Sequence, residues 1–172
     1  MKVAYIVAHK NFRDEEYFIP REILEGVGIE VDTYSNKEGE ARGSEGGDAM
    51  AAGLEEIKVN DYEGVVLAGG QGAPKYLDND EVYSLLNEFK QKSKLIAAIC
   101  ISPTILAKAG LLKDKKATVW SSNMNKSAIR TIEKRGAKYI KGPVVSDGKV
   151  VTADGPEAAK AFGKQIVISL SS

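Results

Sequence analysis

Short apolar runs alternate with amphipathic segments along the chain, and this alternation predicts its secondary structure. The runs VAYIVA (3–8), GVVLAGG (64–70) and KLIAAIC (94–100) are typical of buried strands. Between and after these runs, apolar residues recur at helical spacing, which predicts helices. We expect further strands at 29–34, 116–120 and 137–140, and helices at 15–28, 81–92, 103–112, 126–136 and 156–170.

Two segments depart from this alternation. Residues 36–53 are rich in glycine and lack a strong period, which indicates a surface loop or a short hairpin. Residues 144–153 predict a hairpin that turns at Asp147 and Gly148. The alternation of strands and helices elsewhere predicts an α/β sandwich with a mostly parallel sheet. We expect one domain over 1–172, since this length suffices for a well-buried core.

The composition narrows the range of partners. The 24 lysines and arginines balance 24 acidic residues, so no basic excess is available to hold nucleic acid or an anionic membrane. The apolar run near the N-terminus is too short for a secretory segment or a membrane span, and we expect a cytoplasmic protein. With one cysteine and one histidine, neither an internal disulfide nor a zinc site is expected. We predict no metal and no cofactor, and small molecules or other proteins as partners.

The only cysteine, Cys100, stands where an apolar strand stops and a helical pattern begins. Ligands of open parallel sheets gather beyond the carboxyl ends of the strands. A nucleophile on a sharp turn there has its side chain exposed, and the first amides of the helix lower the pKa of a thiol. Gly69 and Gly70 end another strand and offer a backbone N–H to an oxyanion. The alternative is that Cys100 is a small core residue, as free cysteines often are.

Three motifs resemble the ThiJ/PfpI superfamily. They are A-I-C-x-x-P-x-x-L-A-x-A-G-L-L around Cys100, L-A-G-G upstream, and F-x-D-x-E-x-x-x-P after the first strand. The stretch VVTADGPEAAKAFGKQIV is similar to the T-S-x-G-P segment and closing helix of that family. The family includes protease-like proteins, glyoxalase and deglycase-type enzymes and an oxidative-stress protein associated with parkinsonism. The resemblance implies a flavodoxin-like three-layer sandwich of the class I glutamine amidotransferase-like type, and a homodimer.

The resemblance also implies roles for individual residues. Cys100 matches the nucleophile, and Gly70 with the amide of Ile101 matches the oxyanion-binding pair. Glu16 matches the glutamate beside the thiol, and we prefer this role to the alternative of a solvated glutamate in the first helical turn. A protonated Glu16 would donate a hydrogen bond to sulfur, and we expect the thiol pKa to fall below its ordinary value of about 8.5.

The chain departs from the family pattern at two positions where relatives carry histidine. Ile101 directly follows the cysteine, and Trp120 ends the next predicted strand. Trp120 either covers apolar core or forms a wall of the substrate pocket. The only histidine, His9, is expected to border the same cleft, where a hydrogen-bonded surface role is the alternative to catalysis. Without a suitable histidine, peptide hydrolysis lacks a proton donor for the leaving amine.

Three functions remain open. The first is an enzyme in which Cys100 and Glu16 act on small reactive carbonyls or glycation adducts, a glyoxalase or deglycase-like activity. The second is a redox-responsive stress protein in which Cys100 becomes oxidised. The third, an intracellular cysteine peptidase or amidase, is disfavoured for want of a histidine.

Overall fold

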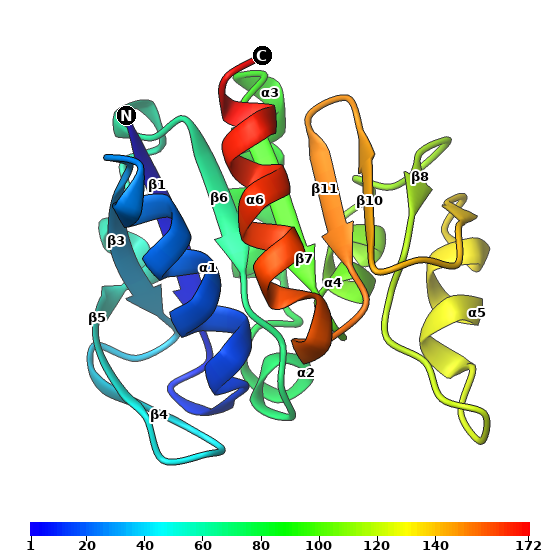
Figure 1. The fold of residues 1–172 in the computed structure, drawn as a ribbon, viewed down its shortest axis with the longest axis horizontal. Helices are drawn as coiled ribbons and strands as arrows, with labels where there is room; N and C mark the ends of the chain where they lie inside the picture. Colours follow the sequence, from blue (N-terminus) through cyan, green and yellow to red (C-terminus); the bar gives the residue numbers. More distant parts are fainter.

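The alternating apolar runs assemble into a nine-stranded, mostly parallel sheet in the computed structural model, which describes residues 1–172 (Figure 1). Its strand order is β10-β11-β7-β6-β1-β3-β5-β4-β2. Only the β4–β5 and β10–β11 pairs are antiparallel. The strands are β1 Lys2–Val7, β2 Lys10–Phe12, β3 Glu30–Ser35, β4 Gly39–Gly43, β5 Asp48–Gly53, β6 Gly64–Leu67, β7 Leu95–Ile99, β10 Val144–Asp147 and β11 Val150–Ala153.

Helices cover both faces of the sheet. They are α1 Asp14–Gly26, α2 Gly72–Tyr76, α3 Asp80–Gln91, α4 Pro103–Lys108, α5 Ser127–Lys134 and α6 Ala159–Leu170. Helices α1 and α6 pack against each other in front of the sheet, and α3 lies behind it (Figure 1). The expected flavodoxin-like three-layer sandwich is therefore confirmed.

Strand β1 shows why two cores form. All but its first residue are buried, and successive side chains point to opposite faces of the sheet. Tyr5 joins the core that contains Tyr17 of α1 and Phe162 of α6, whereas Ile6 joins the core that contains Phe89 of α3. A strand buried on both faces reads as a continuous apolar run, because neither face meets water.

The hairpin predicted at 144–153 is confirmed, and of the surface loop or short hairpin expected at 36–53 the structure shows the hairpin. Residues 36–53 contain the β4–β5 pair, and β10 and β11 pair across the Asp147–Gly148 turn. The strand expected at 116–120 is wrong beyond Ala117, because β8 (Lys116–Ala117) pairs only with β9 (Lys138–Tyr139) in a separate small sheet. Strand β2, helix α2 and the 3₁₀ turns Leu54–Glu56, Val59–Asp61 and Pro156–Ala158 were not expected.

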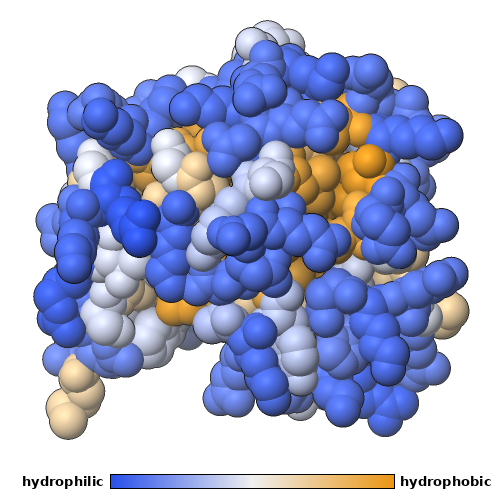
Figure 2. Space-filling view, turned by 180° about the vertical axis from the view of Figure 1, so that it is seen from behind, coloured by the Kyte–Doolittle hydropathy of each residue, from blue (hydrophilic) through white to orange (hydrophobic).

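The parallel strands β6, β7 and β11 end at one edge of the sheet, the lower edge in Figure 1. Viewed from behind, the surface is mostly hydrophilic, with apolar residues in the gaps, and the molecule is notched along this lower edge (Figure 2). None of the helices is both long enough and apolar enough to span a bilayer.

Candidate active site

Cys100 lies on a strained turn between β7 and α4. Its φ of 66° is in the left-handed region, which residues other than glycine rarely adopt. Two backbone hydrogen bonds hold it there: its N–H donates to Ala153 O at 2.9 Å, and its carbonyl accepts from Trp120 N at 2.8 Å. Such strain persists only where the surroundings enforce it. The turn places the thiol, partly exposed, at the edge where the strands end.

Glu16 brings a carboxyl group to the thiol from the first turn of α1. The side chain is fully buried, and its Oε1 accepts a hydrogen bond from Gly69 N at 3.0 Å. A Cβ added to Gly69 would lie 2.5 Å from this Oε1 and 2.7 Å from the Cβ of Cys100, so both residues pack directly against the glycine. The other oxygen, Oε2, is buried and has no hydrogen-bond partner of standard geometry.

Burial shifts both groups toward their neutral forms. It raises the pKa of Glu16 from 4.5 to about 7, against the opposing effect of hydrogen bonding from Cys100 and Gly69. Burial, together with the negative charge of Glu16, raises the pKa of the Cys100 thiol, although the N–H groups of Ile101 and Gly70 lower it. The expected fall of the thiol pKa is thus wrong, because desolvation outweighs the helix-start amides.

The two groups therefore titrate as a pair. Near pH 7 the pair loses its first proton from Glu16, whose pKa is the lower of the two, and the remaining proton stays on the sulfur of Cys100. At neutral pH Glu16 can consequently accept the thiol proton as sulfur attacks a substrate. A buried carboxyl group with a pKa near the working pH is well matched to this transfer.

Gly70 places a backbone N–H beside the sulfur. Its φ is 104°, and an added Cβ would lie 2.5 Å from Arg13 N and 2.6 Å from Asn11 O, so only glycine fits. The N–H groups of Gly70 and Ile101 are close enough to Cys100 to lower its pKa. Two donors that favour negative charge on sulfur also suit an oxyanion formed next to it.

A hydroxyl group links the cysteine turn to the glycine segment. Ser102 is fully buried, and its Oγ donates to Ala68 O at 2.7 Å. The backbone pairing of β6 with β7 ends at Leu67 and Ala98. The bond from Ser102 to Ala68 therefore ties the next residue after β6 to the turn that follows β7. Ser102 thereby helps to fix Gly69 and Gly70 relative to the thiol.

The thiol, the carboxyl group and the two residues that supply the N–H donors line a cleft of about 710 Å³. Such a volume is ordinary for a small-molecule site. Trp120 lines the cleft, in agreement with the expectation that it forms a wall of the pocket. The sequence did not single out six of the lining residues, because isolated polar residues and single prolines carry no distinctive pattern. The lining consists of Arg13, Glu16, Ser44, Glu45, Gly70, Gln71, Pro74, Cys100, Ile101, Trp120 and Pro156.

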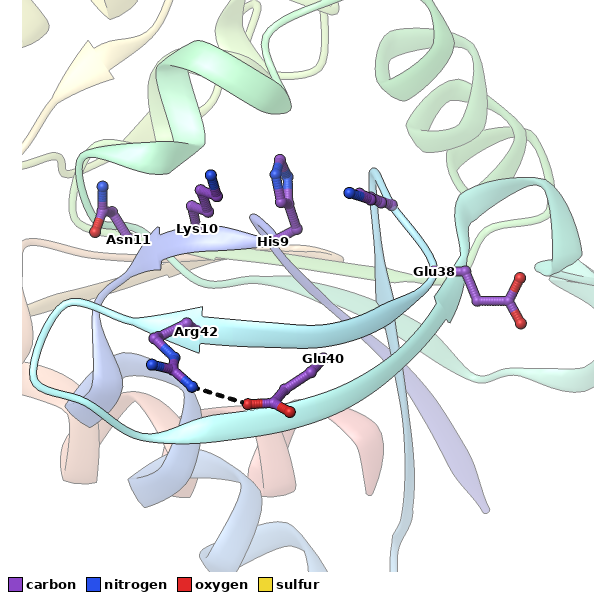
Figure 3. Close-up of a pocket in the computed structure, with 7 residues that line it drawn as sticks. His9, Lys10, Asn11, Glu38, Glu40 and Arg42 are labelled. Atoms are coloured by element: carbon purple, nitrogen blue, oxygen red, sulfur yellow. Dashed lines mark hydrogen bonds and ion pairs between the residues drawn. The ribbon is translucent and has the colours of Figure 1, made fainter.

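His9 does not line this cleft, which corrects the position expected for it. It lines a separate polar pocket of about 540 Å³ with Lys10, Asn11 and residues of the β4 region (Figure 3). Its Nδ1 is 2.7 Å from Asn36 Nδ2, and its ring contacts Tyr76 with centroids 4.4 Å apart. His9 is therefore engaged in local packing and takes no part in the site around the thiol.

No three His, Cys, Asp or Glu side chains are grouped so that they could hold a metal ion. The chemistry available at the cleft is that of a thiol, a carboxyl group near its pKa and two backbone donors. This set is sufficient for addition of a nucleophile to a carbonyl group followed by proton transfer.

The chain is similar to several known proteins over nearly its whole length. An uncharacterized protein of Methanocaldococcus jannaschii is 40% identical over 168 residues, which cover 96% of this chain and 80% of that protein. A deglycase of Thermococcus kodakarensis is 28% identical, over 97% of this chain and 98% of its own. The crystal structure of a ThiJ/PfpI domain protein from Brachyspira murdochii matches with a TM-score of 0.93 and 28% identity, over 99% of this chain and 96% of that one.

The family model described as the DJ-1/PfpI family matches residues 1–169. This match spans the sheet, both helical layers and every residue of the cleft. The chain therefore belongs to the DJ-1/PfpI family.

Proposed function

We propose that the chain is an enzyme in which Cys100 and Glu16 convert small reactive carbonyls, or the adducts that these form with amines, in a glyoxalase or deglycase-like reaction. The observation that carries this proposal is a pair of groups: a partly exposed thiol on a strained turn, beside a buried carboxyl group of pKa about 7. The relatives named deglycases support it.

In the first step, the sulfur of Cys100 bonds to the aldehyde carbon of a 2-oxoaldehyde. The thiol proton passes to the carboxylate of Glu16, and the π electrons of the carbonyl move to its oxygen. The N–H groups of Gly70 and Ile101 donate to this oxygen as its negative charge develops. A hemithioacetal results when the oxygen takes up a proton from Glu16.

The remaining steps need no external oxidant. Glu16, again ionised, moves the proton of the former aldehyde carbon to the neighbouring carbon, and the hydroxyl proton of the first carbon passes to the ketone oxygen. The first carbon is thereby oxidised to a thioester while the ketone is reduced to an alcohol. Water then hydrolyses the thioester, which releases a 2-hydroxy acid and restores the thiol. An aminocarbinol adduct enters the same sequence once its amine has left with a proton.

Peptide hydrolysis fits the site less well. An amide requires a proton for its departing nitrogen, and histidine is the usual donor beside a catalytic cysteine. The only histidine, His9, lines a different pocket. Addition to a free aldehyde makes no such demand, because no amine leaves, and an aminocarbinol can release its amine with the proton of its own hydroxyl group.

Turnover of methylglyoxal tests the proposal. We expect wild-type protein to release 2-hydroxy acid, and Cys100→Ala and Glu16→Gln to lose this activity by at least about a hundredfold. Glu22→Gln, a change in an exposed carboxyl group farther along α1, is the matched control and should keep it. Product must be measured directly, because any thiol forms adducts with aldehydes. Equal product formation by wild type and Cys100→Ala would refute the proposal.

Redox sensing by Cys100 is the second candidate. The observation that favours it is the unpartnered Oε2 of Glu16, which, when protonated, can donate a hydrogen bond to an oxidised sulfur. Mass spectrometry after mild peroxide treatment tests this, with Met124, which is 96% exposed, as an internal standard of oxidant dose. Oxidation of Met124 while Cys100 remains a thiol would exclude the sensor role.

The homodimer implied by the family resemblance also remains a proposal. Sedimentation equilibrium at micromolar concentration should give a mass twice that of one chain. A mass equal to one chain would contradict it.

A further inference from the structure

Arg13 lies between β2 and α1 and is one of the residues that line the cleft. Its backbone N–H donates to Gly69 O at 3.0 Å, and the same nitrogen is the atom that a Cβ on Gly70 would strike at 2.5 Å. The residue that carries the guanidinium group is therefore packed directly against the proposed oxyanion-binding glycine.

The guanidinium group of Arg13 is oriented but not fully occupied. Nε and Nη2 donate to Oε2 of Glu15, at 3.1 and 2.9 Å. Nη1 lies 3.8 Å from Oε1 of Glu45, which is longer than a hydrogen bond. Glu15 thus holds the plane of the group, while Nη1 keeps donors free for a ligand in the cleft.

Arg13 is also the only lysine, arginine or histidine among the residues that line the cleft. Its charge reaches the reactive pair, because it lowers the pKa of Glu16 against the effect of burial. The nearest competitor for Nη1 is Glu45, whose side chain is 58% exposed and makes no closer contact with the group. A desolvated anionic group of a substrate would compete well with such a loosely held carboxylate.

We propose that Arg13 makes the site selective for carbonyl compounds that carry an anionic group, such as a carboxylate, a few bonds from the aldehyde. The inference rests on the proposed function and names its substrate class. With the aldehyde oxygen at the N–H groups of Gly70 and Ile101, the rest of the molecule extends along the cleft past Arg13. The cleft is larger than a three-carbon 2-oxoaldehyde fills, so a longer chain has room.

The first test compares two aldehydes of equal chain length. The selectivity ratio is kcat/KM for 4,5-dioxopentanoate divided by kcat/KM for uncharged 2-oxopentanal. We expect Arg13→Gln to lower this ratio about tenfold and Glu45→Gln to raise it. Arg21→Gln, which removes a cation paired with Glu25 on α1, should leave the ratio unchanged. A ratio that Arg13→Gln leaves within twofold of wild type overturns the proposal.

A second measurement separates this inference from the proposed function. Iodoacetate and iodoacetamide both alkylate a cysteine by displacing iodide, and they differ in charge. The ratio of their rate constants at Cys100 cancels the acidity of the thiol. We expect Arg13→Gln to lower the iodoacetate-to-iodoacetamide ratio about tenfold, even if no aldehyde is turned over. If aldehyde is turned over but Arg13→Gln leaves the alkylation ratio unchanged, the role of Arg13 is refuted while the proposed function stands.

Discussion

Replacing Glu16 by glutamine should stabilise the protein relative to wild type, and this gain in stability should grow as the pH rises. The carboxyl group is fully buried, and its pKa is raised from 4.5 to about 7. A group that binds its proton more tightly in the folded chain than in the unfolded chain favours unfolding when it ionises. Wild-type stability is therefore expected to fall as the pH rises from about 4.5 to about 7.

The size of the effect follows from this rise in pKa. Full ionisation costs about 3 kcal/mol, at about 1.4 kcal/mol for each tenfold change in the acid constant. Roughly 2 to 3 kcal/mol of this cost develops between pH 5 and pH 8. Glutamine keeps an oxygen that can accept from Gly69 N and carries no charge at any pH, so Glu16→Gln avoids the cost.

Urea unfolding followed by the fluorescence of Trp120 measures the difference. We expect the free energy of unfolding of Glu16→Gln, minus that of wild type, to grow by roughly 2 to 3 kcal/mol from pH 5 to pH 8. Glu15→Gln is the control, because Arg13 lowers the pKa of Glu15 and this group stays ionised throughout that range. A Glu16→Gln difference that is the same at both pH values would refute the raised pKa.

Three further predictions concern the geometry of the site. Gly70→Ala should cost both stability and at least about a hundredfold in kcat, because it displaces an oxyanion donor, whereas Gly26→Ala, where an added Cβ meets no atom within 4 Å, should not lower kcat. Urea unfolding of Ser102→Ala should show a loss of about 1 to 3 kcal/mol, since a buried carbonyl group loses its partner; an unchanged midpoint would contradict this. Alkylation of Cys100 should alter the fluorescence emission of Trp120, the only tryptophan, because both residues line the cleft. An identical emission spectrum would contradict their placement in the same cleft.

The sequence predicts the frame of this fold well because that frame depends on local patterns. Continuous apolar runs mark strands such as β1 and β7, which are covered on both faces. The corner at Cys100 is predictable because an apolar strand ends there and Pro103 suits the first position of a helix. Strand β2 escapes prediction, since it has three residues and only Phe12 is buried.

Other features depend on contacts between distant segments, which local patterns do not contain. The strand expected over 116–120 stops early because the N–H of Thr118 donates to the side chain of Thr152 and that of Trp120 to Cys100 O. The acidity of the thiol was predicted with the wrong sign, since the helix-start amides are visible in the sequence and the extent of burial is not. Likewise, Arg13 lines the cleft because it packs against Gly70, which is distant in the sequence, and no sequence motif indicates this contact.

The pH dependence of kcat/KM for methylglyoxal tests the central claim most directly, because the account assigns the reaction to the thiol of Cys100 with ionised Glu16 as its base. We predict that wild-type kcat/KM rises about tenfold per pH unit below pH 7 and levels off above it, as the pair loses its first proton. Glu16→Gln should lose this rise near pH 7. An unchanged midpoint in Glu16→Gln, or a wild-type midpoint above about 8.5 as for an unassisted thiol, would contradict the account.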